Sequence, residues 1–439
     1  MAGTEAAWQA AERGIHVHLY EMRPETSTGA HVSGDLAELV CSNSLGSNLP
    51  DRSSGLLKEE LRMLNSLLVK CAEMTRLPAG NALAVDRKGF SQMVSKKVES
   101  HPNIEVIREE VKTIPDGVVI IASGPLTSER LANSIASLTG EEYLFFYDAI
   151  SPIVTAQSVD MGIAFRGSRY ARDTSDKGDY INCPFDEESY NIFVDELIHA
   201  EKIEIKNFES DIQQGVRAGL HEYFEGCLPV EEMARRGKQT LAFGPMRPIG
   251  LYYPNSEKRP YAVVQLRQDN LAGDLYNLVG FQTNLTFREQ KRVFRLIPGL
   301  RQAEFARYGQ MHRNTFIASP NLLNPNLMYR GRDSLFFAGQ IVGVEGYMGN
   351  IATGLIAGIN SARLVFGEEP VVFPPTSMLG ALTNYIANAD LADFQPMKAN
   401  MGILPSLEKQ IKGKKERAKA YSQRALSDLE NFSRAAGLV

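Results

Sequence analysis

A helix of small residues that runs into a strand ending in an acidic residue opens the chain. The pattern predicts a helix over 5–13 and a strand over 15–20 that leads to Glu21. In a dinucleotide-binding βαβ unit, an acid at this strand end lies roughly 20 residues beyond a G-x-G-x-x-G turn and binds the ribose hydroxyls. Gly3 fits the last glycine of such a turn. The opening therefore predicts the second half of a dinucleotide site.

The first half of that unit would precede Met1. It would hold a strand of roughly five or six residues and the two glycines that let the backbone approach a pyrophosphate. We therefore expect a weakened nucleotide site in a chain that starts here. A start codon placed too late, or a clipped sequence, explains this beginning better than a natural loss of function.

Periodicity divides the chain into four segments. Residues 1–148 alternate helices and strands, and "SSGLLKEELRMLNSLLVKCAEM" predicts one helix with a leucine-rich face. Short strands separated by turn residues dominate 149–330. Alternation returns in 331–400, and a basic helical tail covers 401–439. We therefore expect an α/β fold with a parallel sheet covered on both faces, interrupted by an α+β insertion.

Composition argues against several classes of protein. The 439 residues are 23% charged with a net charge of −5, which argues against wholesale binding to nucleic acid but allows a local basic patch. Four cysteines without C-x-x-C spacing point to a reducing cytoplasm rather than to disulfides or structural zinc. The histidines give no metal signature, and His16 and His18 are expected on a surface strand. No secretory leader precedes the fold, and no apolar run approaches the roughly 18 residues that span a bilayer.

A second nucleotide-binding pattern lies in "FFAGQIVGVEGYMGNIATGLIAGINSARL". A strand end, a run of glycines and a helix N-terminus bring backbone N–H groups to one point, where they can hold a phosphate or a flavin ring edge. The glycines equally allow close contact between helices in any α/β protein. They are Gly339, Gly343, Gly346, Gly349, Gly354 and Gly358. Together with the opening segment, the pattern predicts a two-part flavin site.

Two cysteines lie in polar turns. Cys41 is followed by "SNS", whose donors could polarise a thiol or bind a ring carbonyl. Cys227 lies in "FEGCLPVEEM", before a helix expected from Val230, and a thiol near a helix N-terminus is a better nucleophile. Burial as a small hydrophobic residue remains the alternative for each of them. We expect Cys71 and Cys183 to be structural.

Eight segments resemble one family, the bacterial folate- and FAD-dependent tRNA (uracil-5-)-methyltransferases (TrmFO), which are related to the GidA-type tRNA-modifying flavoproteins. The resemblance runs in order from Gly3 to beyond residue 430. The segments are "GTEAAWQAAERGIHVHLYEMRP", "LAELVCSNSL", "GLLKEELRMLNSL", "PAGNALAVDR", "IIASGPLTS", "FEGCLPVEEMARRGKQTLAFGPMRPIGL", "VQLRQDNLAGDLYNLVGFQTNL" and "FFAGQIVGVEGYMGNIATGLIAGIN".

The resemblance implies an enzyme that forms 5-methyluridine in the T-loop of tRNA. Its implied one-carbon donor is 5,10-methylenetetrahydrofolate, its cofactor is FAD, and NADH or NADPH re-reduces the flavin. The family's two cysteine motifs match Cys41 and Cys227. A thiolate that adds to carbon six of uracil makes carbon five nucleophilic, and a base then removes the proton on carbon five. We assign the attack to Cys227 and the proton transfer, near the flavin, to Cys41.

The resemblance also implies a Rossmann-like FAD-binding domain with a parallel sheet, made of 1–148 and 331–400 and interrupted by a substrate and tRNA domain. The target base is expected to leave the folded T-loop. Basic side chains that could hold phosphates, or be ordinary surface charge, are Arg235, Arg236, Lys238, Arg247 and, in the tail, Lys409, Lys412, Lys414, Lys415, Arg417 and Lys419. The implied cofactor-binding residues are Gly3, Glu21, Arg23, Asn43, Asp86, Gly339, Gln340, Glu345 and Gly346.

Two alternatives stay open. One is a GidA-like enzyme that modifies a wobble uridine with the same cofactors, against which the motifs "CSNSL" and "FEGCLP" argue. The other is a chain that binds tRNA or folate without catalysis. The expected lack of the first strand and first two glycines of the nucleotide site favours this alternative. The sequence leaves the oligomeric state open.

Overall fold

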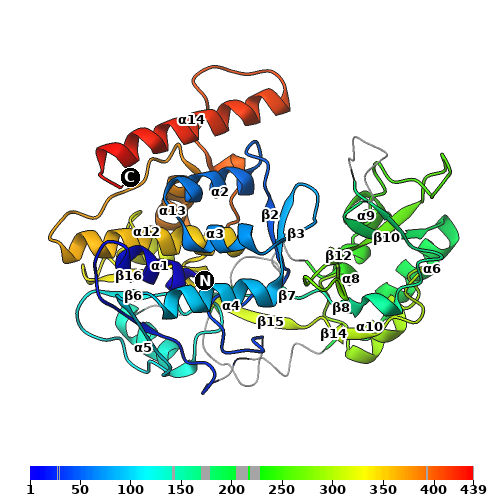
Figure 1. Ribbon diagram of the computed structural model, residues 1–439, viewed down its shortest axis with the longest axis horizontal. Helices are drawn as coiled ribbons and strands as arrows, with labels where there is room; N and C mark the ends of the chain where they lie inside the picture. The colour runs from blue at the N-terminus through cyan, green and yellow to red at the C-terminus, as the bar shows by residue number, and fades with distance from the viewer. Residues whose placement is uncertain are drawn as a thin grey trace.

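The described chain forms two parts (Figure 1), each built around a large hydrophobic core. The computed structural model describes residues 1–26, 28, 30–140, 144–169, 178–203, 216–217, 228–391 and 394–438. Segments from both ends of the sequence build the first core, from Ala2 to Ile135 and again from Ile317 to Leu429. Residues between Val154 and Ala303 build the second core. The chain therefore leaves one core, builds another and returns. The predicted domain limits at 148, 330 and 400 stay predictions.

Parallel strand pairs lie in the first part of the structure. Helix α1 (Ala2–Ala11) leads into β1 (Val17–Tyr20), which pairs in parallel with β5 (Ile104–Ile107). A second parallel pair joins β6 (Val119–Ile121) to β16 (Leu335–Phe337), which is more than 200 residues away in the sequence. Pairing between such distant segments places the glycine-rich turn after β16 beside the opening helix.

Helices and a small antiparallel sheet complete this part. The sheet has the strand order β2-β4-β3, formed by β2 (Ser44–Ser47), β3 (Arg76–Leu77) and β4 (Ala82–Val85). The helices include α2 (Ser53–Met63), α3 (Leu67–Met74), α4 (Arg87–Glu99), α5 (Glu129–Thr139), α11 (Ser319–Leu322), α12 (Tyr347–Val365), α13 (Met378–Asn388) and α14 (Lys414–Ala435), with 3-10 turns η3 (Gln340–Val342) and η5 (Met401–Ile403). The tail helix α14 buries Ala425 and Leu429 in the first core.

The single helix predicted over residues 53–74 is two helices. Asn65 has a φ of 58°, in the left-handed region, and interrupts the helical path. The Ser66 side chain then accepts a hydrogen bond from the Val69 N–H and caps α3. The leucines of the predicted face are nevertheless all buried: Leu56, Leu57, Leu61, Leu64, Leu67 and Leu68. The apolar spacing therefore predicted the buried face but missed the break.

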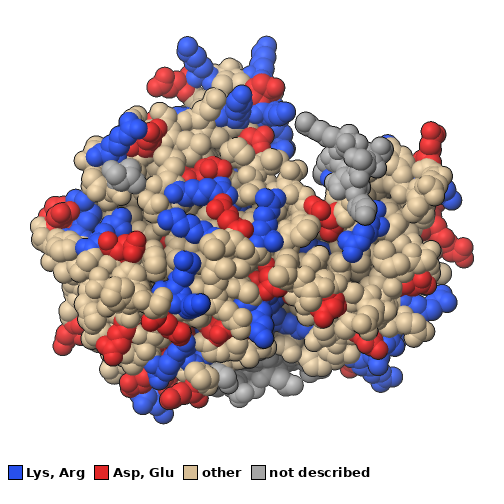
Figure 2. Space-filling model, viewed as in Figure 1, with Lys and Arg blue, Asp and Glu red and all other residues tan. Residues whose placement is uncertain are grey.

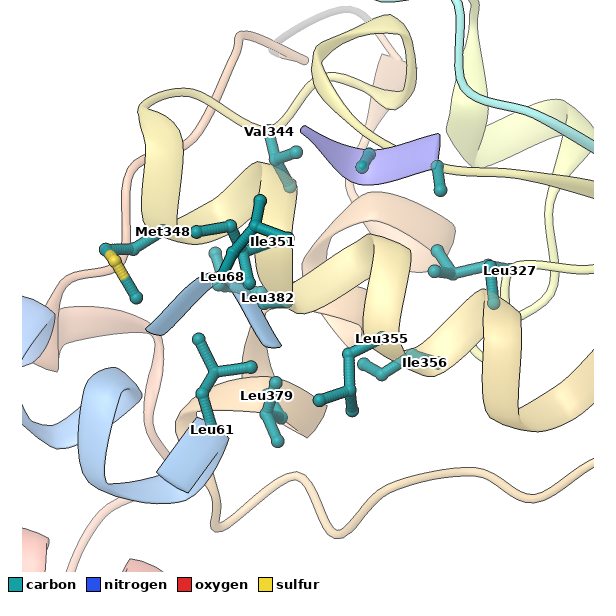
Figure 3. Packing of buried hydrophobic residues seen from close by; sticks show 14 of the residues in the cluster. Leu61, Leu68, Leu327, Val344, Met348, Ile351, Leu355, Ile356, Leu379 and Leu382 are labelled. Atoms are coloured by element: carbon teal, nitrogen blue, oxygen red, sulfur yellow. The ribbon is translucent and has the colours of Figure 1, made fainter. Parts of the chain in front are cut away.

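Helix α12 lies at the centre of the first core. Figure 3 shows its Leu355 among side chains of neighbouring helices, including Leu61 of α2 and Leu379 of α13. On another side, α1 approaches so closely that a Cβ on Gly354 would lie 2.3 Å from the Ala2 carbonyl oxygen. A Cβ on Gly358 would lie 2.5 Å from the Ala6 carbonyl oxygen. These two glycines therefore serve contact between helices, the alternative that the sequence left open for the glycine run.

An antiparallel sheet forms the second part, in the order β14-β8-β13-β12-β10-β9. Its strands are β8 (Ile153–Thr155), β9 (Phe165–Gly167), β10 (Tyr180–Phe185), β12 (Ala262–Gln268), β13 (Leu275–Leu278) and β14 (Phe305–Arg307). The helices there include α6 (Glu187–His199), α8 (Val230–Arg235), α9 (Thr240–Phe243) and α10 (Phe287–Phe294), with the turn η1 (Ala156–Ser158). Strands β7 (Leu144–Ala149) and β15 (Met311–Phe316) lie between the two parts (Figure 1). Strand β11 (Val216–Arg217) pairs with β7.

The contact between α1 and α12 gives a prediction for stability. Gly354→Ala places a methyl group against the backbone of α1, so we expect the free energy of unfolding to fall by about 1–3 kcal/mol. Gly349→Ala in the same helix is the matched control, because its Cβ would lie at an ordinary 3.4 Å from Val344. Denaturant unfolding measures both variants. Equal stability of the two would contradict the close helix contact.

Candidate active site

The structure brings the two predicted nucleotide-binding patterns together. Gly339 follows β16 with a φ of 87°, and a Cβ there would lie 2.9 Å from the Cβ of Ala2. Gly3 in turn lies against β1 and the end of β6, since a Cβ on it would lie 3.8 Å from Leu19 and 3.4 Å from Ala122. The start of α1 and the end of β16 therefore meet, although more than 330 residues separate them in the sequence.

Glu21 lies at the end of β1 and is fixed by Arg23. The Arg23 Nε lies 2.9 Å from Glu21 Oε1, and Nη2 lies 3.0 Å from Oε2. Burial alone would raise the pKa of Glu21, but the hydrogen bonds and charge of Arg23 outweigh it and hold that pKa below its ordinary value. Arg23 also reaches Glu38 at 3.2 Å. A carboxylate has about four acceptor sites, so Glu21 keeps capacity for a sugar hydroxyl.

The start of α12 offers groups that a ligand could satisfy. Gly343 and Gly346 have φ values of 81° and 82°, and Gly346 begins the helix without a side-chain cap. The buried Asn350 Oδ1 has no hydrogen-bond partner within the described part of the chain, and it lies 3.7 Å from where a Cβ on Gly339 would be. Nearby, Gln340 donates to Glu345 at 2.9 Å. Buried polar atoms without partners are rare, so this one indicates a missing hydrogen-bonding group.

Cys41 lies beside the first residue of that helix. Its backbone N–H donates to the Tyr347 hydroxyl at 2.8 Å. Its carbonyl accepts from Arg87 Nη2, in the first turn of α4, at 3.0 Å. The half-buried Cys41 is thus held between the N-terminal ends of α12 and α4. The cysteine and the glycine-rich turn, predicted separately from the sequence, form one site.

Charged residues of the second part complete this site. Arg87 makes a bidentate ion pair with Asp269, at 3.1 Å from Nε to Oδ2 and 2.9 Å from Nη2 to Oδ1. Arg267 donates to Ser42 Oγ at 2.6 Å and to Asn43 Oδ1 at 2.8 Å. The residues around Cys41 are therefore bound on one side by the end of β12.

Asn43 and Asp86, which the resemblance assigned to the cofactor, make contacts between the two parts. The fully buried Asn43 donates from Nδ2 to the carbonyls of Val85 and Gln268, each at 2.9 Å. Asp86 caps α4 and also accepts from the Leu271 N–H. These contacts hold the two parts in register, and a cofactor contact by either residue stays a prediction.

Cys227 lies outside the described residues, whereas α8 begins at Val230 as expected.

Of the basic side chains named from the sequence, Lys238 forms an ion pair with Asp195 at 2.8 Å, and Arg235 donates to the Ile198 carbonyl at 2.7 Å. The basic residues of the tail are exposed. Figure 2 shows cationic and anionic side chains interspersed over the face that it draws. Attraction of a polyanion by that face would therefore be local.

Sequence reasoning missed the charged partners of Cys41. Arg267 and Asp269 lie in "YAVVQLRQD", a motif that carries charges at the end of an apolar strand. Such charges are rarely buried unless they are paired. Arg87 lies in the motif "PAGNALAVDR" and Tyr347 lies within the glycine-rich run, and neither motif by itself indicates a contact with Cys41. The charges at the end of the apolar strand indicated that partners exist. The partners could not be identified from the sequence, because the ion pair joins residues 182 positions apart.

One group within the described ranges could hold a metal ion. The ligand atoms of His16, His18 and Glu105 lie within 4.8 Å of one another, and all three residues are exposed. His18 and Glu105 are paired across β1 and β5, and His16 directly precedes β1. Glu105 comes from a different strand, which is why the histidines alone gave no signature. The group shares no residue with the surroundings of Cys41. None of the helices that the structure describes is long and apolar enough to cross a membrane.

Known proteins define the class to which this fold and site belong. The family model described as "Glucose inhibited division protein A" matches residues 1–369. Two crystal forms of Aquifex aeolicus GidA superpose on 100% of this chain with TM-scores of 0.67 and 0.68, at 16% and 17% identity, and match 72% and 74% of those chains. They confirm the expected α/β fold.

Closer relatives define the particular family. Two proteins named "Methylenetetrahydrofolate--tRNA-(uracil-5-)-methyltransferase TrmFO", from Halalkalibacterium halodurans and Pelotomaculum thermopropionicum, are each 54% identical to this chain. The matches span 434 and 433 residues, or 98% of this chain and 96% of each relative. The Anoxybacillus flavithermus protein of the same name is also 54% identical. The chain belongs to the TrmFO family.

The ion pair beside Cys41 gives a second prediction. Asp269→Asn leaves the Arg87 guanidinium buried without its counter-charge, so we expect the free energy of unfolding to fall by about 3–5 kcal/mol. The control is Asp116→Asn, at an exposed aspartate, which should change stability by less than about 0.5 kcal/mol. Denaturant unfolding compares the variants. If the free energy of unfolding falls no more in Asp269→Asn than in the control, the buried ion pair between the two parts is contradicted.

Proposed function

We propose that the chain transfers a one-carbon unit from 5,10-methylenetetrahydrofolate to carbon five of a uridine in tRNA and forms 5-methyluridine. The observation that carries this proposal is the position of Cys41 at the start of α12, in a chain 54% identical to proteins named for this activity. The relatives' names favour this function over the wobble-uridine alternative. We place the target uridine in the T-loop.

The residues present fit FAD as the cofactor. Gly3 and Gly339 let backbone approach a pyrophosphate between α1 and β16, and Glu21 is placed for a ribose hydroxyl. The uncapped start of α12 suits a phosphate or the electron-rich edge of a ring, and Asn350 supplies an unused acceptor. Bound FAD would supply the reducing electrons that turn the transferred carbon into a methyl group.

The chemistry on uracil needs a nucleophile and a base. We assign the nucleophile to Cys227, whose thiolate adds to carbon six and pushes the electron pair of the C5=C6 bond towards carbon five. Carbon five can then attack the one-carbon unit. We assign the base to Cys41. When it takes the proton from carbon five, the C–H electrons re-form the double bond and expel the Cys227 sulfur as a thiolate.

Further assignments follow from the same chemistry. NADH or NADPH would provide the electrons that keep the cofactor reduced. The basic side chains of the second part and of the tail would bind phosphates of tRNA, which supply affinity without reading sequence. The cytoplasm is the compartment that this substrate and four cysteines without a disulfide pattern favour.

Replacement of each cysteine separates the two roles. Methylation of T-loop-unmodified tRNA should fall at least about 100-fold in both Cys41→Ala and Cys227→Ala, because each removes a group needed in the reaction. With 5-fluorouridine-containing tRNA, Cys41→Ala should still form a covalent adduct, whereas Cys227→Ala should form none. Cys71→Ala is the matched control, since that side chain is buried in α3, and it should retain turnover.

The two measurements test the two cysteine assignments separately. An adduct that survives loss of Cys227 contradicts the assignment of the nucleophile. Full turnover by Cys41→Ala contradicts the assignment of the base. If none of the proteins methylates tRNA, or if nucleoside analysis places the modification at the wobble position, the proposed function itself is wrong.

A further inference from the structure

Three arginines lie near Cys41, and we call them the arginine cluster: Arg87, Arg267 and Arg307. Arg87 donates to the Cys41 carbonyl, Arg267 donates to the side chain of the next residue, Ser42, and Arg307 interacts electrostatically with Cys41. They come from three elements, α4, β12 and β14. Among the described residues, the titratable and charged groups that interact electrostatically with Cys41 include these arginines and the Tyr347 phenol. The Asp269 carboxylate faces the arginines, and Tyr180 on β10 is paired with Arg267. The described surroundings of this thiol are therefore strongly cationic.

The strand register places two of these arginines on the same side of the sheet. Ile153 pairs with Asn277, and Asn277 pairs with Arg267, so these three residues form one row across β8, β13 and β12. Arg307 pairs with Ile153 and extends the row to β14, where the register shifts between Phe305 and Arg307. Residues paired in this way share a face. The residues next to them along the strands belong to the second core: Val154, Tyr276 and Leu266. The row therefore faces the other way, where Arg267 reaches Ser42.

The three guanidinium charges are not equally balanced. Arg87 is neutralised by its bidentate ion pair with Asp269. The hydrogen-bond acceptors of Arg267 are uncharged, namely the side chains of Ser42 and Asn43 and, at 3.5 Å, Asn277. No described side chain makes a hydrogen bond or an ion pair with the half-buried Arg307 guanidinium. Two positive charges thus lack a counter-charge of their own.

Burial makes this imbalance costly. Arg267 is 7% exposed, and burial lowers the pKa of its guanidinium. Burial, and then the neighbouring Arg87, lowers the pKa of Arg307 as well. A charge held out of water needs a partner of opposite charge nearby. In the same row, the Asn277 Nδ2 is buried and has no partner in the described part of the structure. An anion beside Arg267, Arg307 and Asn277 would therefore balance the charge of this row and accept its free hydrogen bond.

Cys41 is the group best suited to be that anion. Among the described residues, the acids that interact electrostatically with Arg307 include Tyr347, Cys41 and Asp269. Asp269 is already bound to Arg87, and burial raises the pKa of the Tyr347 phenol, as does the nearby Cys41, so the phenol stays neutral. A thiol ionises more easily than a phenol, and adjacent arginines stabilise the thiolate.

We propose that Arg307, assisted by Arg267, holds the Cys41 side chain as a thiolate. Arg307 is a positioning residue in this proposal, because it acts on the substrate only through the sulfur. The proposal rests on the proposed function, in which Cys41 takes the proton from carbon five, and only the thiolate can accept that proton. An ordinary thiol is mostly protonated near pH 7, so the two arginines bring the base to its working form.

The pH dependence of alkylation tests this proposal without tRNA or folate. The purified full chain is treated with iodoacetamide from pH 5 to 9.5, and mass spectrometry of the Cys41 peptide gives the rate at each pH. In Arg307→Gln we expect the midpoint of the profile to rise by about one unit or more, with an alkylation rate near pH 7 about tenfold lower, because one adjacent charge is gone. Arg307→Lys should restore most of the shift. Arg301→Gln, at an exposed arginine nearby, is the matched control and should leave the profile unchanged.

An unchanged midpoint in folded Arg307→Gln overturns the proposal. The unaltered protein gives a second test that needs no variant. Its Cys41 midpoint should lie below the value of about 8.5 for an ordinary cysteine, and a midpoint at or above that value also overturns the proposal. Failure here is distinct from failure of the proposed function, which the methylation assay measures separately.

Discussion

The ion pair between Arg87 and Asp269 joins the two cores at the position of Cys41. Arg87 is the first residue of α4 in the first part, and Asp269 directly follows β12 in the second part. Because Arg87 also donates to the Cys41 carbonyl, the ion pair fixes the cysteine loop relative to both parts. The residues proposed to act with Cys41 are therefore held by a contact between the two parts.

The site meets two different demands. A flavin needs a close backbone approach and an uncapped helix N-terminus, and the glycines after β16 provide both. The base that we propose at Cys41 would need cations close by, and the sheet of the second part contributes Arg267 and Arg307. Helix α12 satisfies the first demand, and its first residue, Tyr347, touches Cys41. The second part thus supplies charge to a site whose backbone belongs to the first.

Periodicity and motif spacing predicted the α/β fold, the opening helix and strand, and the glycine-rich turn, because each of these is encoded within about 30 residues. The break at Asn65 was missed, since a single left-handed residue leaves the apolar spacing intact. The charged partners of Cys41 were missed for another reason. Arg87 and Asp269 meet only when the cores form, and Arg307 joins Arg267 only through the strand order of the sheet. Such pairings cannot be derived from local sequence.

The most direct test of the proposed function is the fate of an isotopically labelled carbon. Tracing is done with 5,10-methylenetetrahydrofolate that carries carbon-13 in its methylene group, incubated with the protein, NADH and T-loop-unmodified tRNA. Nucleoside mass spectrometry of the T-loop fragment should show 5-methyluridine that carries the label. Label found in the anticodon fragment, or 5-methyluridine without the label, would contradict the proposed function.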